Sequence, residues 1–348
     1  MNNQLLRKEV GELLTYDNSV DIIRYYLSFA VLFAHFAELT QTHNYFPTPS
    51  YTAVGGFFVL SGFLVFLSYT KSLSLLQYFK RRMARILPPY FFIVLLCAIG
   101  GIFISDLSVI DYFSSTQFWK YLTSNLLFAN FLQPTLPGVF DANIIEAVNG
   151  SLWTMKIEVM LYVSIPLVAL LLLRKHKALV LVLIYVLSYL YKTWMGYLYF
   201  ETGDEIYRIM QRQVGGQLMF FYSGAAILLY FDYFQKYIVH IFSIASIVVL
   251  ASLWVAWFEV IEPLCLAILI IGFAYNCKYF SWMRKFDNIA YGIYLFHFPI
   301  IQLVVYWGVD KINIYYAFLL VVLMTISLSI FSWVFIEKPI LAKCHKKR

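Results

Sequence analysis

The chain has 348 residues, of which 61% are hydrophobic and only 13% are charged. An average soluble domain is about 25% charged, so this composition excludes a soluble globular protein and indicates an integral membrane protein. The net charge of +7 does not indicate a nucleic-acid partner, because the basic residues form short clusters between apolar runs, which is the pattern that orients membrane proteins.

Apolar runs of spanning length recur along the whole chain, and we interpret ten of them as transmembrane helices. The predicted spans are 22–40, 51–70, 86–104, 151–173, 178–195, 213–231, 238–257, 262–277, 288–308 and 315–336. The polar segment 1–21 lacks the apolar core of a cleavable signal peptide, so we expect the first span to remain as an anchor.

The basic residues predict the orientation of these spans. With the N-terminus inside, the inner segments hold 19 of the 26 Lys and Arg residues, the outer segments hold four, and three lie within spans. A cytoplasmic excess of this kind is the usual topology signal. We therefore predict an all-α integral membrane protein, a single transmembrane domain over 1–348 with about ten spans and both termini in the cytoplasm. The expected location is a membrane, with lipid around the bundle.

The outer segment 105–150 contains an apolar stretch, 117–133, that also carries Lys120, Asn125 and Asn130. A further span here would move the basic cluster at 174–177 to the outside. We therefore predict an interfacial or re-entrant helix within the outer segment.

The first predicted span carries an unusual polar face. Arg24 and His35 are eleven residues apart, which is almost three helical turns, so they share one face about 16 Å apart along the axis. A lone histidine here is explained by a hydrogen bond that joins two helices. Arg24 and Glu38 on the same face favour a functional site instead, because ionisable groups at membrane depth mark substrate or proton pathways. Glu38, one turn away, is expected to hold the imidazole in one tautomer.

A basic cluster of Lys80, Arg81, Arg82 and Arg85 precedes the third span, and Pro88 and Pro89 follow it. A helix places the guanidinium groups of Arg82 and Arg85 on one side, which suits the capture of phosphate. Inner loops of membrane proteins are generally basic, however, so a topology signal alone explains the cluster as well as phosphate binding does. The proline pair is expected to end or kink the helix at the membrane surface.

Three further segments carry polar or small residues inside apolar runs. The glycines of 55–62 permit close packing of helix backbones. Lys156 and Glu158 lie two residues apart and point in different directions on a helix, so each needs another partner. His297, in the ninth span, is assigned equally to a core hydrogen bond or to a site role.

The four cysteines and six histidines lack the spacing of a metal site. We expect no metal and no disulfide framework, because three cysteines lie in or at the ends of apolar spans and Cys344 lies in a basic tail.

Six collinear elements together resemble the membrane-bound acyltransferase-3 family, over about residues 20 to 340. The elements are Arg24 with His35, Phe57–Phe63, Arg81–Pro88, Leu152–Glu158 with Tyr162 and Pro166, Tyr291–Pro299, and Glu337–Pro339. Each element is weak by itself, but six in the same order are specific.

This resemblance implies transfer of an acyl group, usually acetyl from cytoplasmic acetyl-CoA, to a hydroxyl of an extracytoplasmic glycan. It implies that His35 is the catalytic histidine, with Arg24 its companion on the donor side. We expect Glu38 and Glu158 to belong to the catalytic site. The resemblance also implies that Arg82 and Arg85 bind the CoA phosphates. We add Arg81 and Ser61 to the donor-binding residues.

The sequence departs from the commonest family pattern at Lys156, where a small or hydroxyl residue is usual, and at Ala290, which replaces a serine. The first departure concerns acceptor specificity. We expect a surface-glycan O-acetyltransferase type without the appended hydrolase-like domain of some relatives. The alternatives are a polytopic transporter or glycan flippase, which explains the buried charges but not the six elements, and a structural envelope subunit, which explains neither.

Overall fold

A computed structural model describes residues 18–346, except 173, 175 and 253–258. Every regular element within these residues is helical. The polar segment 1–17, Lys175 of the inner basic cluster, the last two residues and the end of the predicted span 238–257 lie outside the described residues.

The chain divides into two compact units, which alternate along the sequence. The first unit contains residues up to Ile23, Tyr51–Tyr78 and Ile157–Phe286. The second contains Arg24–Ser50, Phe79–Lys156 and the residues from Asp287 onward. Each unit is therefore assembled from segments that are separated in the sequence.

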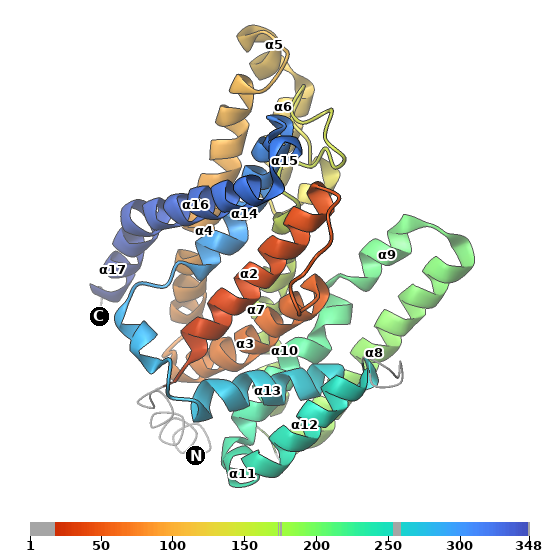
Figure 1. Ribbon diagram of the computed structural model, residues 1–348. Coiled ribbons are helices and arrows are strands. Elements are labelled where there is room, and N and C mark those ends of the chain that lie inside the picture. Colours follow the sequence, from red (N-terminus) through yellow and green to blue (C-terminus); the bar gives the residue numbers. More distant parts are fainter. Residues whose placement is uncertain (1–17, 173, 175, 253–258, 347–348) are drawn as a thin grey trace. The chain divides into compact units, whose positions relative to one another are not determined.

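The first unit is a bundle in which α10 packs against α8 and α13, and α12 packs along α13 (Figure 1). Its helices are α3 (Ser50–Lys71), most of α7 (Trp153–Leu172), α8 (Lys177–Thr202), α9 (Glu205–Gln211), α10 (Val214–Leu229), α11 (Phe231–Lys236), α12 (Ile238–Ser252) and α13 (Glu262–Asn276). A 3-10 turn, Ser281–Lys285, follows α13.

The glycines of α3 explain how closely the helices of the first unit pack. A Cβ on Gly62 would overlap the backbone carbonyl of Phe221 in α10, and a Cβ on Gly224 of α10 would overlap the carbonyl of Val59. The two backbones therefore touch where neither residue has a side chain, as the sequence predicted from the small residues.

In the second unit, α14 lies along α16 (Figure 1). The helices are most of α2 (Val20–Leu39), most of α4 (Leu75–Gly100), α5 (Val109–Ser114), α6 (Thr116–Leu126), α14 (Ala290–Tyr306), α15 (Val309–Ile312), α16 (Ile314–Ser332) and α17 (Lys338–Lys346). Gly292 permits the close packing of α14 on α16, because a Cβ there would lie 2.9 Å from Cβ of Ser329. A π-helical turn, Trp333–Glu337, joins α16 to α17.

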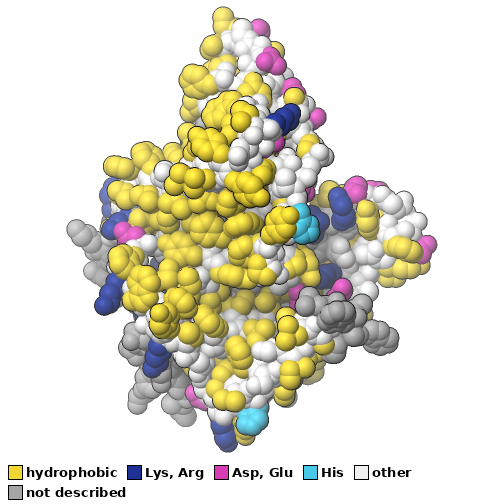
Figure 2. Space-filling model, in the orientation of Figure 1, with side chains coloured by type: hydrophobic (Ala, Val, Ile, Leu, Met, Phe, Trp, Pro, Cys, Tyr) yellow, Lys and Arg dark blue, Asp and Glu magenta, His cyan; other side chains and the backbone are white. Residues whose placement is uncertain are grey.

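Six helical segments within the described residues are long and apolar enough to cross a membrane, as expected for an integral membrane protein. They are Val20–Leu39, Ser50–Lys71, Leu75–Phe103, Gly150–Leu172, Lys177–Thr202 and Ile314–Cys344. Shorter apolar helices cover three more of the predicted spans, and α10 covers the remaining one. Hydrophobic side chains cover much of the face in view in Figure 2, and on α8 large apolar residues such as Leu183, Leu187 and Leu190 are exposed.

Two local predictions can be compared directly with the helices. The stretch 117–133 forms α6 and a 3-10 turn at Asn130–Leu132, so it is a short helix, as predicted, and is too short for a span. The proline pair does not end its helix, because α4 begins at Leu75 and continues through Pro88 and Pro89 to Gly100. Such a helix persists where neighbouring groups satisfy the carbonyls that proline leaves without a donor.

Candidate functional site

The two intramembrane histidines of the second unit form a direct pair. Nδ1 of His35, in α2, lies 2.8 Å from Nε2 of His297, in α14. The two ring planes are nearly parallel, with an interplanar angle of 14° and centroids 5.1 Å apart. Phe298 presents its ring edge-on to His35, with centroids 5.1 Å apart. The pair joins two polar groups that the sequence placed in separate segments, 262 residues apart.

A network of neutral hydrogen bonds surrounds this imidazole pair. Nδ1 of His297 lies 2.9 Å from the carbonyl oxygen of Ile293, and the Oγ of Ser151 lies 3.4 Å from Nε2 of His297. The Ser28 hydroxyl, on α2, donates to the carbonyl of Ala290 at 2.8 Å and fixes α2 against α14. His297 and Ser28 are fully buried, so the bonds to Ile293 and Ala290 are made away from water and hold the geometry strongly.

Pro299 explains how the segment that carries Ser151 is attached to α14. Proline lacks an N–H, so the helix leaves the carbonyl of Leu295 without a donor. The side chain of Asn149 donates to that carbonyl at 2.9 Å and accepts from the backbone N–H of Ser151 at 3.0 Å. Asn149 thereby holds the short helix Gly150–Leu152 beside the imidazole pair.

Buried Gln302 fixes the outer segment to the same helix. Its side-chain amide donates to the carbonyls of Ile145 and Ala147, and it accepts from the amide of Asn143. A buried amide with all its partners present supports one conformation of the loop. The segment 143–147 is therefore tied to the helix that carries His297.

A carboxylate forms the second polar centre, in the first unit. Glu158 of α7 accepts hydrogen bonds from the hydroxyls of Tyr162 and Ser61, the latter at 3.3 Å. Tyr162 is one helical turn from Glu158 on α7, and Ser61 comes from the glycine-rich part of α3. Two of the predicted site residues, Glu158 and Ser61, are thus in contact, and Glu158 has the separate partners that the sequence required.

The predicted phosphate-binding arginines lie on one continuous helix of the second unit. Arg81, Arg82 and Arg85 are half-buried on α4, whereas Lys80 is exposed. Glu337, buried in the π-helical turn, accepts from Ser332 at 3.1 Å and interacts electrostatically with Arg85. A π-helical turn often marks a functional site. The sequence did not connect Glu337 with Arg85, because the two residues are far apart in the chain.

Glu38 and Arg24, two further predicted site residues, lie on α2 with His35. The Nδ1 partner of His35 is His297, and Glu38 is exposed at the end of α2. Arg24 is half-buried on the same helix. Lys156 lies over the ring of Phe131, 4.5 Å from its centroid, so an aromatic face is a partner of its ammonium group.

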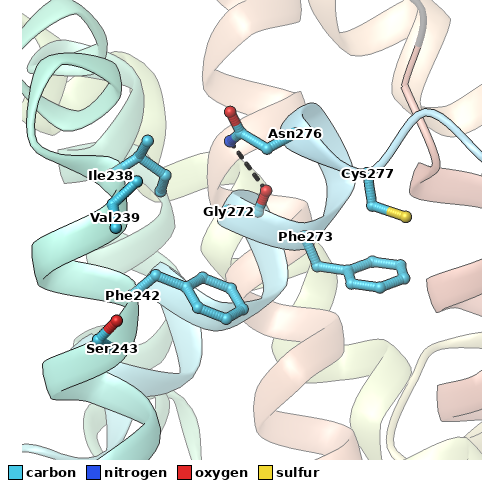
Figure 3. Close-up of a pocket in the computed structure, with 8 residues that line it drawn as sticks. All are labelled: Ile238, Val239, Phe242, Ser243, Gly272, Phe273, Asn276 and Cys277. Carbon is cyan, nitrogen blue, oxygen red and sulfur yellow. Dashed lines mark hydrogen bonds between the residues drawn. The ribbon is translucent and has the colours of Figure 1, made fainter.

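A pocket of about 440 Å³ lies between α12 and α13 in the first unit (Figure 3). Phe242 and Phe273 line it, and its side-chain amide, Asn276, donates to the carbonyl of Gly272. The residues that line it carry no carboxylate, imidazole or ammonium group, and Cys277 is the one with an ionisable side chain. Among the described residues, no group of three or more His, Cys, Asp or Glu side chains is placed to hold a metal ion.

Comparison with known proteins identifies the family of the chain. A family model described as an acyltransferase domain matches residues 17–336. The chain belongs to the acyltransferase-3 family.

Relatives of this acyltransferase are described as O-acetyltransferases or as a nodulation protein. Nodulation protein 10 of Rhizobium leguminosarum bv. viciae is 23% identical over 92% of this chain and 92% of its own length. The O-acetyl transferase of Shigella phage Sf6 is 25% identical over 95% and 98%. The O-acetyltransferase OatA of Staphylococcus aureus is 26% identical over 85% of this chain but only 53% of its own length. No solved structure matches.

The elements that suggested the acyltransferase-3 family gather mostly in the second unit. His35, Arg82, Arg85, His297 and Glu337 all belong to it. The element Phe57–Phe63 and Glu158 belong to the first unit. The histidine and arginine residues of these elements therefore come from separate segments of the chain that belong to one unit of the fold.

Proposed function

We propose that this acyltransferase moves an acyl group, acetyl in the simplest case, from cytoplasmic acetyl-CoA to a hydroxyl of an extracytoplasmic polysaccharide or oligosaccharide. The observation that supports it most is the imidazole pair of His35 and His297 on apolar helices. Imidazole is the commonest general acid and base, and ionisable groups at membrane depth mark reaction or transport pathways. The relatives described as O-acetyltransferases support the same reaction class.

In this proposal His35 is the general base. It accepts the proton of the acceptor hydroxyl as the oxygen attacks the acyl carbon, and returns that proton to the departing CoA sulfur. Acetyl-CoA supplies the acyl group already activated as a thioester. A positioned base contributes about a hundredfold to ten-thousandfold to such a reaction.

The donor-binding residues in this proposal are Arg81, Arg82 and Arg85, with Arg24 and Ser61 on the donor side. The half-buried guanidinium groups on α4 fit phosphate, because a planar guanidinium forms two parallel hydrogen bonds with phosphate oxygens. Glu158 completes the polar groups assigned to the site. Its bonds to Tyr162 and Ser61 keep the carboxylate in one orientation.

The proposed topology has ten spans with both termini in the cytoplasm of a bacterial cell. The distribution of Lys and Arg supports it. We expect a thiol reagent that does not cross membranes to label Asn44→Cys and Glu201→Cys in intact cells. Ser74→Cys and Arg174→Cys are expected to react only after the membrane is opened. Labelling in the opposite sense contradicts the topology and, with it, outward transfer.

Mass spectrometry of surface glycan tests the function itself. Cells with the wild-type gene are expected to carry an acyl substituent, of the mass of acetyl in the simplest case, that is missing from cells without the gene. A change in the amount of surface glycan with no change in its acylation favours a glycan flippase and contradicts the proposal.

A further inference from the structure

His297 has no role in the mechanism so far, although it is fully buried and in contact with His35. A neutral imidazole has one donor nitrogen and one acceptor nitrogen, so each bond that the ring makes restricts the other. The bonds of His297 therefore determine which nitrogen of His35 carries the hydrogen.

The argument starts at the carbonyl of Ile293. A carbonyl oxygen only accepts hydrogen bonds, and it lies 2.9 Å from Nδ1 of His297, so Nδ1 carries the hydrogen and donates. In the neutral ring, Nε2 of His297 is then an acceptor. Burial favours the neutral ring, because an imidazolium removed from water needs a counter-charge.

The second step concerns the pair itself. Nε2 of His297 accepts, so Nδ1 of His35, at 2.8 Å, donates to it. The Ser151 hydroxyl also approaches Nε2 of His297, but at 3.4 Å it is the weaker competitor for the single lone pair. With its hydrogen on Nδ1, the His35 ring has its lone pair on Nε2.

We propose that His297 is a positioning residue that fixes His35 in the tautomer whose Nε2 is the base. The proposal rests on the proposed function for its catalytic meaning, but the tautomer is a property of the resting protein. The chain of bonds runs from Ile293 through His297 to His35, and Ser28 holds α2 on α14 beside it. His297 thus fills the orienting role that the sequence gave to Glu38.

Two polar substitutions of His297, of similar size, test whether this residue positions His35 or only supports the packing of α14. In His297→Gln, the side-chain oxygen is as many bonds from the backbone as Nε2 of histidine, so an acceptor for His35 remains. In His297→Asn, the amide reaches only as far as Nδ1, so the bond to Ile293 survives while the acceptor for His35 is lost. Transfer kinetics with acetyl-CoA and de-O-acetylated surface polysaccharide are measured for both, with exposed His43→Ala as the control.

The expected result is that kcat falls at least about tenfold in His297→Asn, because the base is no longer held ready, while KM for acetyl-CoA is unchanged. His297→Gln is expected to stay within about threefold of wild type, because its acceptor keeps the bond to Nδ1 of His35. Equal activity of the two variants, or higher activity of His297→Asn, overturns the proposal.

A spectroscopic readout needs no enzyme activity. Nitrogen NMR of protein labelled with 15N in its histidine rings, compared with His35→Ala, identifies the His35 signals. We expect a protonated Nδ1 and an unprotonated Nε2 in wild type, and the opposite tautomer overturns the proposal. If wild type has this tautomer but transfers no acyl group, the proposed function fails and the positioning by His297 stands.

Discussion

The imidazole pair and the arginine cluster, both in the second unit, differ in burial and in charge. His297 is completely buried, and its ring is bonded to Ile293 and His35 through both nitrogens. Arg81, Arg82 and Arg85 are half-buried, with Glu337 the electrostatic partner of Arg85. Neutral groups can be buried once their hydrogen bonds are made, whereas guanidinium groups retain access to water or to an anion.

We expect this difference to separate the residues that act in chemistry from those that act in binding. A fully bonded, buried network is rigid, so its loss is expected to lower kcat. A half-buried cationic cluster binds an anionic group equally in ground state and transition state, so its loss is expected to raise KM. The following substitutions test this division, beginning with the largest expected effect.

His35→Ala is expected to lower kcat by about a hundredfold or more, because alanine cannot accept a proton from the acceptor hydroxyl. Insertion and folding are expected to survive, since alanine is well tolerated in an apolar helix. Acyl transfer by purified protein is the measurement, and His43→Ala is the matched control. Wild-type rates in His35→Ala would remove His35 from the mechanism.

Arg82→Ala and Arg85→Ala are each expected to raise KM for acetyl-CoA by about tenfold to a hundredfold, because a charge-assisted hydrogen bond is worth about 1.5 to 3 kcal/mol. KM for the glycan should change little. Lys80→Ala is the control, since Lys80 lies on the same helix but is exposed. Superimposable acetyl-CoA titrations of all three variants and wild type leave the cluster as a topology signal only.

Glu158→Ala probes the first unit, where the carboxylate accepts from Tyr162 and Ser61. Removal leaves the two hydroxyls without their acceptor, which costs about 1 to 3 kcal/mol of stability. Ser61→Ala removes only one donor and is expected to cost about 1 kcal/mol or less. Thermal unfolding in detergent measures both, and an equal loss in the two variants would show that Glu158 is not the centre of this contact.

Glu38→Gln is expected to have the smallest effect, less than about threefold on kcat, because Glu38 is exposed and a hydrogen bond at an exposed site contributes little. The comparison with His297→Asn decides which residue orients His35. A larger loss of kcat in Glu38→Gln than in His297→Asn would return that role to Glu38, as the sequence alone predicted.

The sequence predicted the helices well because long apolar runs have few alternatives in a membrane. It also placed Arg24 and His35 on one helix face, because helical periodicity is local. It did not find the contact of His35 with His297, or the electrostatic interaction of Arg85 with Glu337. Both join segments that are distant in the chain, and no local pattern encodes which helix packs against which.

The proline pair shows a different limit of sequence reasoning. Pro88 and Pro89 remove two backbone donors, which in an isolated helix costs about 3 kcal/mol or more per residue. α4 nevertheless continues through both residues. Tertiary packing decides whether such a helix continues, and Pro299 of α14 gives the clearest example, since Asn149 satisfies the carbonyl that this proline leaves free.

The most direct test of the account is a sided transfer assay with purified protein in sealed liposomes. Acetyl-CoA carrying a 14C acetyl group is enclosed, and de-O-acetylated surface polysaccharide is added outside. We predict that wild type transfers the label to the outer polysaccharide and that His35→Ala does not. Label transferred equally by His35→Ala, or transport of the polysaccharide into the liposomes without label on it, would contradict transfer across the membrane through His35.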